Sequence, residues 1–83
     1  MFYVYILECA DTTLYIGSTN NLERRLHEHN TSKKGAHYTK IRRPVHLKYH
    51  EKCETHSIAL KREADLKKLT REQKRALYDG ITT

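Results

Sequence analysis

The pattern of hydrophobic residues predicts a β-hairpin at the start of the chain. Residues 1–7 are β-branched or aromatic and apolar on both faces, which is typical of a short buried strand. Turn-forming residues follow at 9–13, and residues 14–18 predict a second strand, antiparallel to the first. Gly17 marks a place where another backbone or a ligand can approach this strand closely. Alternate side chains of the first strand point to opposite faces, with Phe2, Val4 and Ile6 on one and Tyr3, Tyr5 and Leu7 on the other.

A helix is predicted directly after the hairpin, over residues 21–30. Asn20 is a suitable N-cap for it, and Glu23 lies three residues later, as in a capping box. Leu22 and Leu26 lie on one side of this helix and are expected to face the core.

The second half of the chain predicts one strand and two helices. Strict alternation over residues 45–50 is typical of a half-buried edge strand with Val45, Leu47 and Tyr49 pointing inward. A second helix is predicted over residues 55–69, with an apolar stripe of Ile58, Ala59, Leu66 and Leu69. A third helix is predicted after it, capped by Thr70 and Gln73, running to about Tyr78 and ending near Gly80. The order strand, strand, helix, strand, helix, helix predicts a mixed α/β fold of the α+β type, a three-stranded antiparallel sheet flanked by helices.

Length and composition limit what such a chain can be. With 83 residues it is expected to form one domain over residues 1–83, with a single thin core. Charged residues make up 31% and there is no apolar run of about 18 residues, so we expect a soluble cytoplasmic protein with no membrane partner. The two cysteines, Cys9 and Cys53, are too few for a disulfide framework and are expected to be reduced thiols.

The positive charge is concentrated in one part of the sequence. Residues 1–23 have no Lys or Arg and three acidic residues, whereas residues 24–83 carry all 16 basic residues and a net charge of +9. A small domain with this distribution is typical of a protein that binds a polyanion, and we expect the partner to be DNA, with RNA left open. The densest basic stretch is the connection 31–43, whose nucleic-acid-binding candidates are Lys33, Lys34, Tyr38, Lys40, Arg42 and Arg43.

Five side chains are candidates for chemistry. Tyr5 and Tyr15 lie on adjacent strands and can share one face of the sheet, although packing into the core would explain them equally well. Arg25 and His29 are four residues apart, so they share one side of a helix where they suit a phosphate; two solvated surface residues are the alternative.

The fifth candidate, Glu63, lies at the margin of the apolar stripe of the second predicted helix. It is a candidate metal ligand or base, and the alternative is an ion pair with Lys67, four residues later. Cys53 and His56 have a spacing found in zinc sites, but the sequence offers no second close pair of ligands, so zinc is disfavoured.

Taken together, these positions resemble the GIY-YIG nuclease superfamily. The resemblance covers residues 2–69: Tyr3-Val4-Tyr5, then Tyr15-Ile16-Gly17, then Arg25 eight residues after the glycine with His29 four beyond it, and finally Ala59-Leu60-x-x-Glu63. The chain is most similar to short, stand-alone members whose physiological role is generally unassigned. Two positions depart from the pattern of some relatives, because Ser18 stands where they have Lys and Arg75 stands where they have Asn.

The resemblance implies a function and a role for each candidate. It implies hydrolysis of DNA phosphodiester bonds with one divalent metal ion, Mg²⁺ or Mn²⁺, which Glu63 would hold. Arg25 would contact the scissile phosphate, Tyr5 and Tyr15 would position or deprotonate the attacking water, and His29 would lie beside the reacting groups. Branched or damaged DNA in repair or recombination is the expected substrate. Two rival functions remain: a nucleic-acid-binding module with a vestigial site, and a protein that docks on an unknown protein partner.

Overall fold

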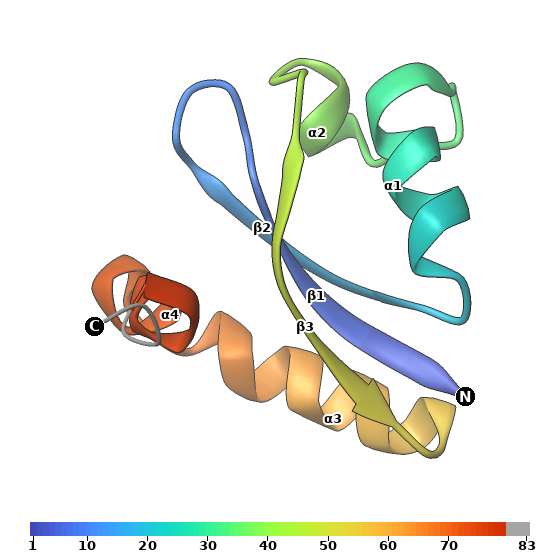
Figure 1. The fold of residues 1–83 in the computed structure, drawn as a ribbon, viewed down its shortest axis with the longest axis vertical. Helices are drawn as coiled ribbons and strands as arrows, with labels where there is room; N and C mark the ends of the chain where they lie inside the picture. Colours follow the sequence, from blue (N-terminus) through green and yellow to red (C-terminus); the bar gives the residue numbers. More distant parts are fainter. Residues whose placement is uncertain (80–83) are drawn as a thin grey trace.

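The computed structural model describes residues 1–79, which form three strands and four helices (Figure 1). They are β1 (Phe2–Glu8), β2 (Leu14–Thr19), α1 (Leu22–Thr31), α2 (His37–Lys40), β3 (His46–Cys53), α3 (His56–Lys67) and α4 (Arg71–Asp79). The sheet is antiparallel throughout with the order β2-β1-β3, so β3 lies at an edge. The predicted fold class and element order are confirmed, and α2 is an additional short helix within the basic connection.

The sheet separates two helical layers, with α3 and α4 on one side and α1 and α2 on the other (Figure 1). The α3/α4 face is built from Val4, Ile6, Ile16, Cys53, Ala59 and Leu66. The α1/α2 face is built from Tyr5, Leu7, Cys9 and Val45, with Tyr15, Leu22, Leu26, Tyr38 and Leu47 packed against them. The central strand β1 therefore contributes alternate side chains to both layers, as its sequence predicted.

The edge strand β3 departs from the predicted alternation. Ile6 pairs with Tyr49 but the next residue, Leu7, pairs with Leu47, so Lys48 is an extra residue at a bulge. Tyr49 consequently packs on the α3/α4 face and Leu47 on the α1/α2 face. The prediction that these two side chains point the same way was wrong, because one inserted residue reverses the face of everything beyond it.

The start of α1 also differs from the prediction. The N-cap is Asn21, whose side chain accepts a hydrogen bond from the Arg24 backbone N–H at 3.0 Å. β2 continues to Thr19, one residue further than predicted, and this shifts the helix start by one. Asn20, the predicted cap, accepts a hydrogen bond from the Arg24 guanidinium instead, at 3.0 Å.

The basic connection 31–43 contains one helical turn. The carbonyl of Ala36 accepts hydrogen bonds from the backbone N–H groups of Thr39 and Lys40, which forms α2. Gly35 brings this turn against α1, because a Cβ at position 35 would lie 2.6 Å from the Glu28 carbonyl oxygen. The connection is thus anchored to α1 rather than free in solvent.

Helix α3 begins at the predicted cap, since Thr55 accepts a hydrogen bond from the Ile58 backbone N–H at 3.2 Å. Ala59 and Leu66 are fully buried, but Ile58, which was expected in the apolar stripe, is half-exposed. Successive helical residues are about 100° apart, and packing through Ala59 leaves Ile58 beside the contact rather than within it.

Helix α4 has the predicted capping box, in which Thr70 and Gln73 exchange two hydrogen bonds. The predicted end at Gly80 lies outside the described residues. Arg75 pairs with Glu8 at 3.0 Å, which ties α4 to the hairpin end of β1. Between residues 1 and 79, no helix has the length and apolar character needed to cross a bilayer.

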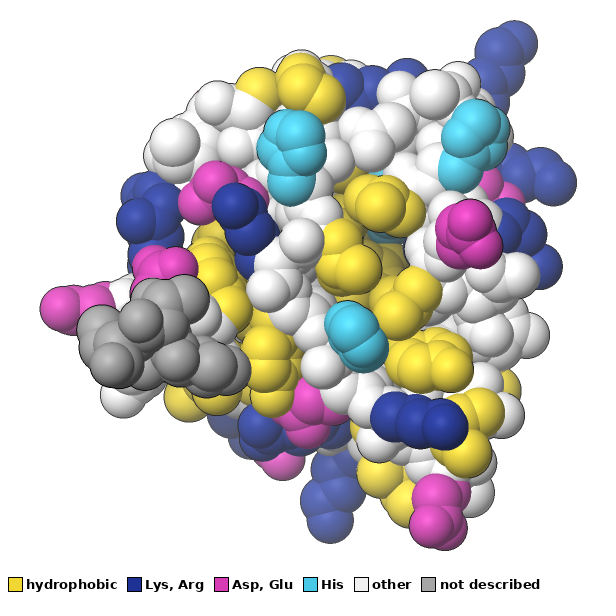
Figure 2. All heavy atoms as spheres, viewed as in Figure 1, with side chains coloured by type: hydrophobic (Ala, Val, Ile, Leu, Met, Phe, Trp, Pro, Cys, Tyr) yellow, Lys and Arg dark blue, Asp and Glu magenta, His cyan; other side chains and the backbone are white. Residues whose placement is uncertain are grey.

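The α1/α2 face is only partly covered. Hydrophobic side chains remain visible between β3 and α1 in the space-filling view (Figure 2). A crevice beneath α1 has no room for a water molecule and is lined by Tyr5, Leu7, Leu22, Arg25, Leu26 and Leu47. One side of Tyr5 therefore lies in a dry, apolar environment.

Candidate functional site

The two candidate tyrosines lie on the same face of the hairpin. Tyr5 pairs with Gly17 across the strands, and Tyr15 pairs with Leu7. The ring of Tyr5 lies over Gly17 so closely that a Cβ at position 17 would overlap the hydroxyl and lie 2.7 Å from Cζ. Gly17 was predicted as a place of close approach, and what approaches it is the side chain of Tyr5. The glycine after Tyr15 and Ile16 is needed because any side chain there would displace Tyr5.

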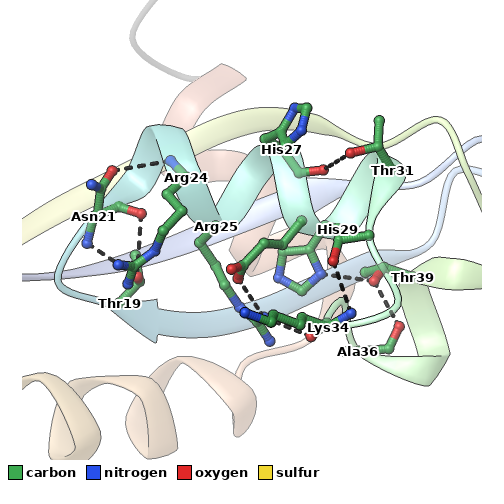
Figure 3. Close-up of polar contacts among 12 residues, drawn as sticks. Thr19, Asn21, Arg24, Arg25, His27, His29, Thr31, Lys34, Ala36 and Thr39 are labelled. Atoms are coloured by element: carbon green, nitrogen blue, oxygen red, sulfur yellow. Dashed lines mark hydrogen bonds and ion pairs between the residues drawn. The ribbon is translucent and has the colours of Figure 1, made fainter.

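A buried hydrogen-bond chain starts at Tyr5. Its hydroxyl lies 2.9 Å from Nε2 of His29, and Nδ1 of His29 lies 2.7 Å from Oγ1 of Thr39. Oγ1 of Thr39 in turn lies 2.8 Å from the carbonyl oxygen of Ala36 (Figure 3). His29 and Thr39 are the polar residues that are fully buried within residues 1–79, and each satisfies the other.

The environment keeps both Tyr5 and His29 neutral near pH 7. Burial raises the pKa of Tyr5 to about 12, although the neighbouring charge of Arg25 acts in the opposite direction. Burial, together with the positive charge of Arg25, lowers the pKa of His29 to about 4. Neither group is a charged acid or base before substrate arrives.

Tyr15 is the more accessible of the two tyrosines, since it is only partly buried. Its ring makes an edge-on contact with His29, with 5.2 Å between ring centroids, and stacks on Tyr38 at 5.9 Å. The Arg42 guanidinium lies over the other ring of this stack, 3.8 Å from the centroid of Tyr38. An aromatic row thus runs from the buried histidine toward the surface.

Arg25 projects from α1 beside this row. Its Nη1 donates to Oε1 of Glu28 at 3.0 Å and to the carbonyl oxygen of Lys34 at 2.9 Å (Figure 3). Burial alone would lower the pKa of Arg25, but Glu28 and Tyr5 outweigh it and the net pKa is raised. The guanidinium is therefore a fixed positive charge. The neighbouring Arg24 is exposed.

Glu63 comes from the opposite helical layer. It lies on α3, and its Oε2 accepts a hydrogen bond from Nζ of Lys67 at 2.8 Å. Although burial is the main reason for the raised pKa of Tyr5, the charge of Glu63 contributes to it, and Lys67 interacts with Tyr15. The sequence offered a ligand or an intrahelical ion pair at this position. The structure has the ion pair.

The two arginines of the basic connection have structural partners. Arg43 donates to the backbone oxygens of Glu28, His29 and Ser32 at the end of α1. Arg42 donates to Oδ2 of Asp11 and to the backbone oxygen of Tyr38. These side chains hold the connection in place, although both were predicted as candidates for binding nucleic acid.

The lysines of the same connection have the opposite character. Lys33, Lys34 and Lys40 are exposed, and the backbone carbonyl of Lys34 accepts a hydrogen bond from Arg25. Their ammonium groups are available to a polyanion.

Within the described residues, no group of three or more His, Cys, Asp or Glu side chains could hold a metal ion. His56 stacks on Phe2 with 4.8 Å between ring centroids, and Cys9 and Cys53 are both free and buried. A metal ion at the site would take one carboxylate from this chain, that of Glu63.

Sequence reasoning missed Thr39 and Glu28. A threonine in a polar connection has no pattern that marks it, because its value comes from contact with His29, ten residues away. Glu28 could have been found, since it lies three residues after Arg25 on one side of a helix.

The comparisons with known proteins identify the class to which this arrangement belongs. The sequence model of the GIY-YIG catalytic domain matches residues 1–76, so the chain belongs to the GIY-YIG family, which is a nuclease family. This confirms the resemblance inferred from the motifs.

Its relatives define the branch of that family more narrowly. A UPF0213 protein of Syntrophus aciditrophicus is 58% identical over 72 residues, which cover 87% of this chain and 83% of that protein. A UPF0213 protein of Desulfotalea psychrophila is 54% identical over 76 residues, covering 92% of this chain and 69% of that protein.

Two solution NMR structures are also similar. The UPF0213 protein of Bacillus halodurans has a TM-score of 0.57 and 40% identity, over 93% of this chain and 82% of that one. A protein of E. faecalis has a TM-score of 0.61 and 44% identity, over 98% and 86%.

Proposed function

We propose that this protein is a metal-dependent endonuclease that hydrolyses DNA phosphodiester bonds. The observation that carries the proposal is the convergence of Tyr5, Tyr15, Arg25 and His29 on the α1/α2 face, and the charge of Glu63 contributes to the raised pKa of Tyr5. These are the positions of the family motifs, and the domain match supports their use in nuclease chemistry. Branched or damaged DNA is the proposed substrate.

In this proposal Arg25 binds the scissile phosphate. A guanidinium offers two parallel N–H groups that match phosphate oxygens, and it stabilises the negative charge that builds up in the transition state. Arg25 keeps its charge in this site and is partly exposed, with 26% of its side chain accessible. Its contacts with Glu28 and Lys34 hold the side chain in one orientation before DNA binds.

The two tyrosines have different roles in this proposal. Tyr15 is partly exposed, so it contacts the attacking water and orients it toward the phosphorus. Tyr5 is 2% exposed and its hydroxyl is hydrogen-bonded to His29, so it supports the site from the buried side without contacting the water directly. The raised pKa of Tyr5 makes it a poor base on its own.

Glu63 would hold Mg²⁺ or Mn²⁺. The donor set fits a weakly held Mg²⁺, because this ion keeps several waters and commonly uses one carboxylate together with phosphate oxygens of the substrate. When bound, the ion lowers the pKa of a coordinated water and stabilises charge on the phosphoryl oxygens. Glu63 must exchange its contact with Lys67 for the metal, and this exchange is easy because a surface pair of this kind contributes only about 0.3–0.5 kcal/mol.

The nucleic acid would lie along the exposed lysines of the basic connection. Lys33, Lys34 and Lys40 supply charge near Arg25, and Tyr38 offers a ring on which a base can stack. Arg42 and Arg43 contribute indirectly, by shaping the connection. An interaction with a protein partner that directs the domain to its substrate is compatible with this arrangement.

A nucleic-acid-binding module with a vestigial site is the second candidate. The ion pairs Arg25–Glu28 and Glu63–Lys67 favour it, because they already occupy the guanidinium and the carboxylate that a nuclease would use. Arg75, at the position where some relatives have Asn, is bonded to Glu8 on the far side of the sheet from α1.

A cleavage assay on a panel of substrates separates the two candidates. The panel contains supercoiled plasmid, single strand, flap, fork and four-way junction, each with Mg²⁺ and with Mn²⁺. Arg25→Ala and Glu63→Gln are compared with the wild type, and Arg24→Ala is the matched control on the same helix. Metal-dependent cleavage that is lost in the first two variants and kept in the control supports the nuclease. Salt-sensitive binding without cleavage under any condition supports the binding module.

A further inference from the structure

The hydrogen-bond chain beneath Arg25 has a defined direction, and Thr39 sets it. A threonine hydroxyl has one proton, and the Ala36 carbonyl 2.8 Å away can only accept. In the structure the Thr39 hydroxyl donates its proton to this carbonyl. Oγ1 of Thr39 must then accept the proton on Nδ1 of His29, 2.7 Å away.

The direction continues through the imidazole ring. A neutral histidine with its proton on Nδ1 has a lone pair on Nε2. Tyr5, whose hydroxyl oxygen lies 2.9 Å from Nε2, must donate its proton to that lone pair. The phenolic oxygen then has only lone pairs to offer to Arg25, which lines the same crevice as Tyr5.

The opposite tautomer would reverse this polarity. With the proton on Nε2, His29 would donate to Tyr5, and the proton of Tyr5 would have to turn toward Arg25 or the solvent. A hydroxyl proton and a guanidinium N–H repel each other when they point at the same space. The position of the Arg25 side chain is thus sensitive to the tautomer of His29.

We infer that Thr39 is a positioning residue, which fixes the tautomer of His29 so that Tyr5 presents lone pairs to Arg25. The one-turn helix α2 holds the Thr39 side chain against the carbonyl of Ala36, the residue at which the turn begins. His29 and Thr39 are both fully buried, so water does not substitute for either partner. The consequence for catalysis rests on the proposed function, but the tautomer does not.

The direct test is the tautomer of His29 in the wild-type protein, measured by two-bond ¹⁵N–¹H NMR of the imidazole rings. The expected result is a proton on Nδ1 and none on Nε2. A proton on Nε2 would overturn the inference, whatever the activity of the protein.

Three variants extend the test to function. Thr39→Val keeps the shape but removes the acceptor, so His29 is expected to move its proton to Nε2 in a measurable fraction of molecules. Cleavage of the best substrate in the panel is then expected to fall roughly 10-fold to 100-fold, the range seen when a partner that orients a functional side chain is lost. Thr39→Ser restores the hydroxyl and is expected to restore both the tautomer and the rate.

Thr31→Val is the matched control. The Thr31 hydroxyl donates to the His27 carbonyl at 2.8 Å on the exposed side of α1, so removing it should change neither readout (Figure 3). A fall in cleavage for Thr39→Val with an unchanged tautomer would reduce Thr39 to a packing role. If the wild type shows the Nδ1 tautomer and no cleavage, the proposed function fails and the assignment of Thr39 stands. If Thr39→Val does not fold, the wild-type spectrum and Thr39→Ser still decide.

Discussion

On the α3/α4 face of the sheet, β1 sends Val4 and Ile6 into a core of largely aliphatic side chains, whereas on the α1/α2 face the same strand presents Tyr5 to a buried histidine. The first face gains stability simply from the apolar area that it buries. The second face buries hydroxyl and imidazole groups, and each of these destabilises the fold unless it has a hydrogen-bond partner. The contrast shows how a chain of 83 residues combines an apolar core on one face of its sheet with a buried polar cluster on the other. One face of the sheet holds the fold, and the other face uses that stability to keep polar groups in fixed positions.

The largest expected effect on stability lies on the α3/α4 face. Leu66 is fully buried, and Leu66→Ala should lower the free energy of unfolding by about 2–5 kcal/mol through lost burial and a new cavity. Leu60→Ala on the same helix is the control, because Leu60 is half-exposed and its loss should cost under about 0.5 kcal/mol. Urea denaturation measures both. Equal losses for the two variants would mean that α3 does not pack as described.

On the α1/α2 face, the expected effect is a loss of stability in acid. Burial, followed by the charge of Arg25, lowers the pKa of His29 from 6.5 to about 4, so between these values the unfolded chain binds a proton that the folded protein does not. Stability should therefore fall as the pH drops from 6.5 to 4, by up to about 3 kcal/mol. Denaturation at several pH values measures this slope.

The slope has a matched control. His29→Gln should flatten it, whereas His46→Gln, at an exposed position on β3, should leave it unchanged. If the slope of His29→Gln matches that of the wild type, other groups cause the acid sensitivity and the assignment to His29 is wrong.

A smaller effect separates structural from binding arginines on the α1/α2 face. Arg43 donates to backbone carbonyls at the end of α1, so Arg43→Gln should destabilise the protein by about 2 kcal/mol, as for hydrogen bonds made by a charged group. Lys40→Gln removes the same charge from an exposed position and should leave stability unchanged while weakening DNA binding. Thermal denaturation measures the stability of both variants, and DNA titration measures their affinity. If Arg43→Gln were as stable as the wild type, the distinction between the two residues would be wrong.

The smallest effect on stability belongs to Glu63, at the margin between the two faces. Its pair with Lys67 is a partly exposed helical ion pair, so Glu63→Gln should change stability by only about 0.3–0.5 kcal/mol. The same variant should abolish metal-dependent cleavage while leaving DNA binding intact. A large loss of stability would show that Glu63 is a structural residue, and the cleavage result would then need a different explanation.

The motif residues and the elements that carry them could be predicted from the sequence to different degrees. The faces of β1, the capping box of Thr70 and Gln73, and the shared side of Arg25 and His29 follow from local periodicity. The bulge at Lys48 and the exposed position of Ile58 could not be predicted, because pairing between strands and the packing angle of a helix are decided by the whole fold.

What the sequence by itself determined is the list of chemical groups and the order of the elements, since residue types and periods of 2 and 3.6 are local properties. What only the tertiary structure decided is which of those groups meet. It brought Tyr5 from the first strand, His29 from α1 and Thr39 from α2 into one hydrogen-bond chain, and it turned Arg43 from a candidate DNA contact into a cap for α1. The physical reason is that a buried polar group must find its partner in space, and the chain offers that partner wherever the fold brings one close.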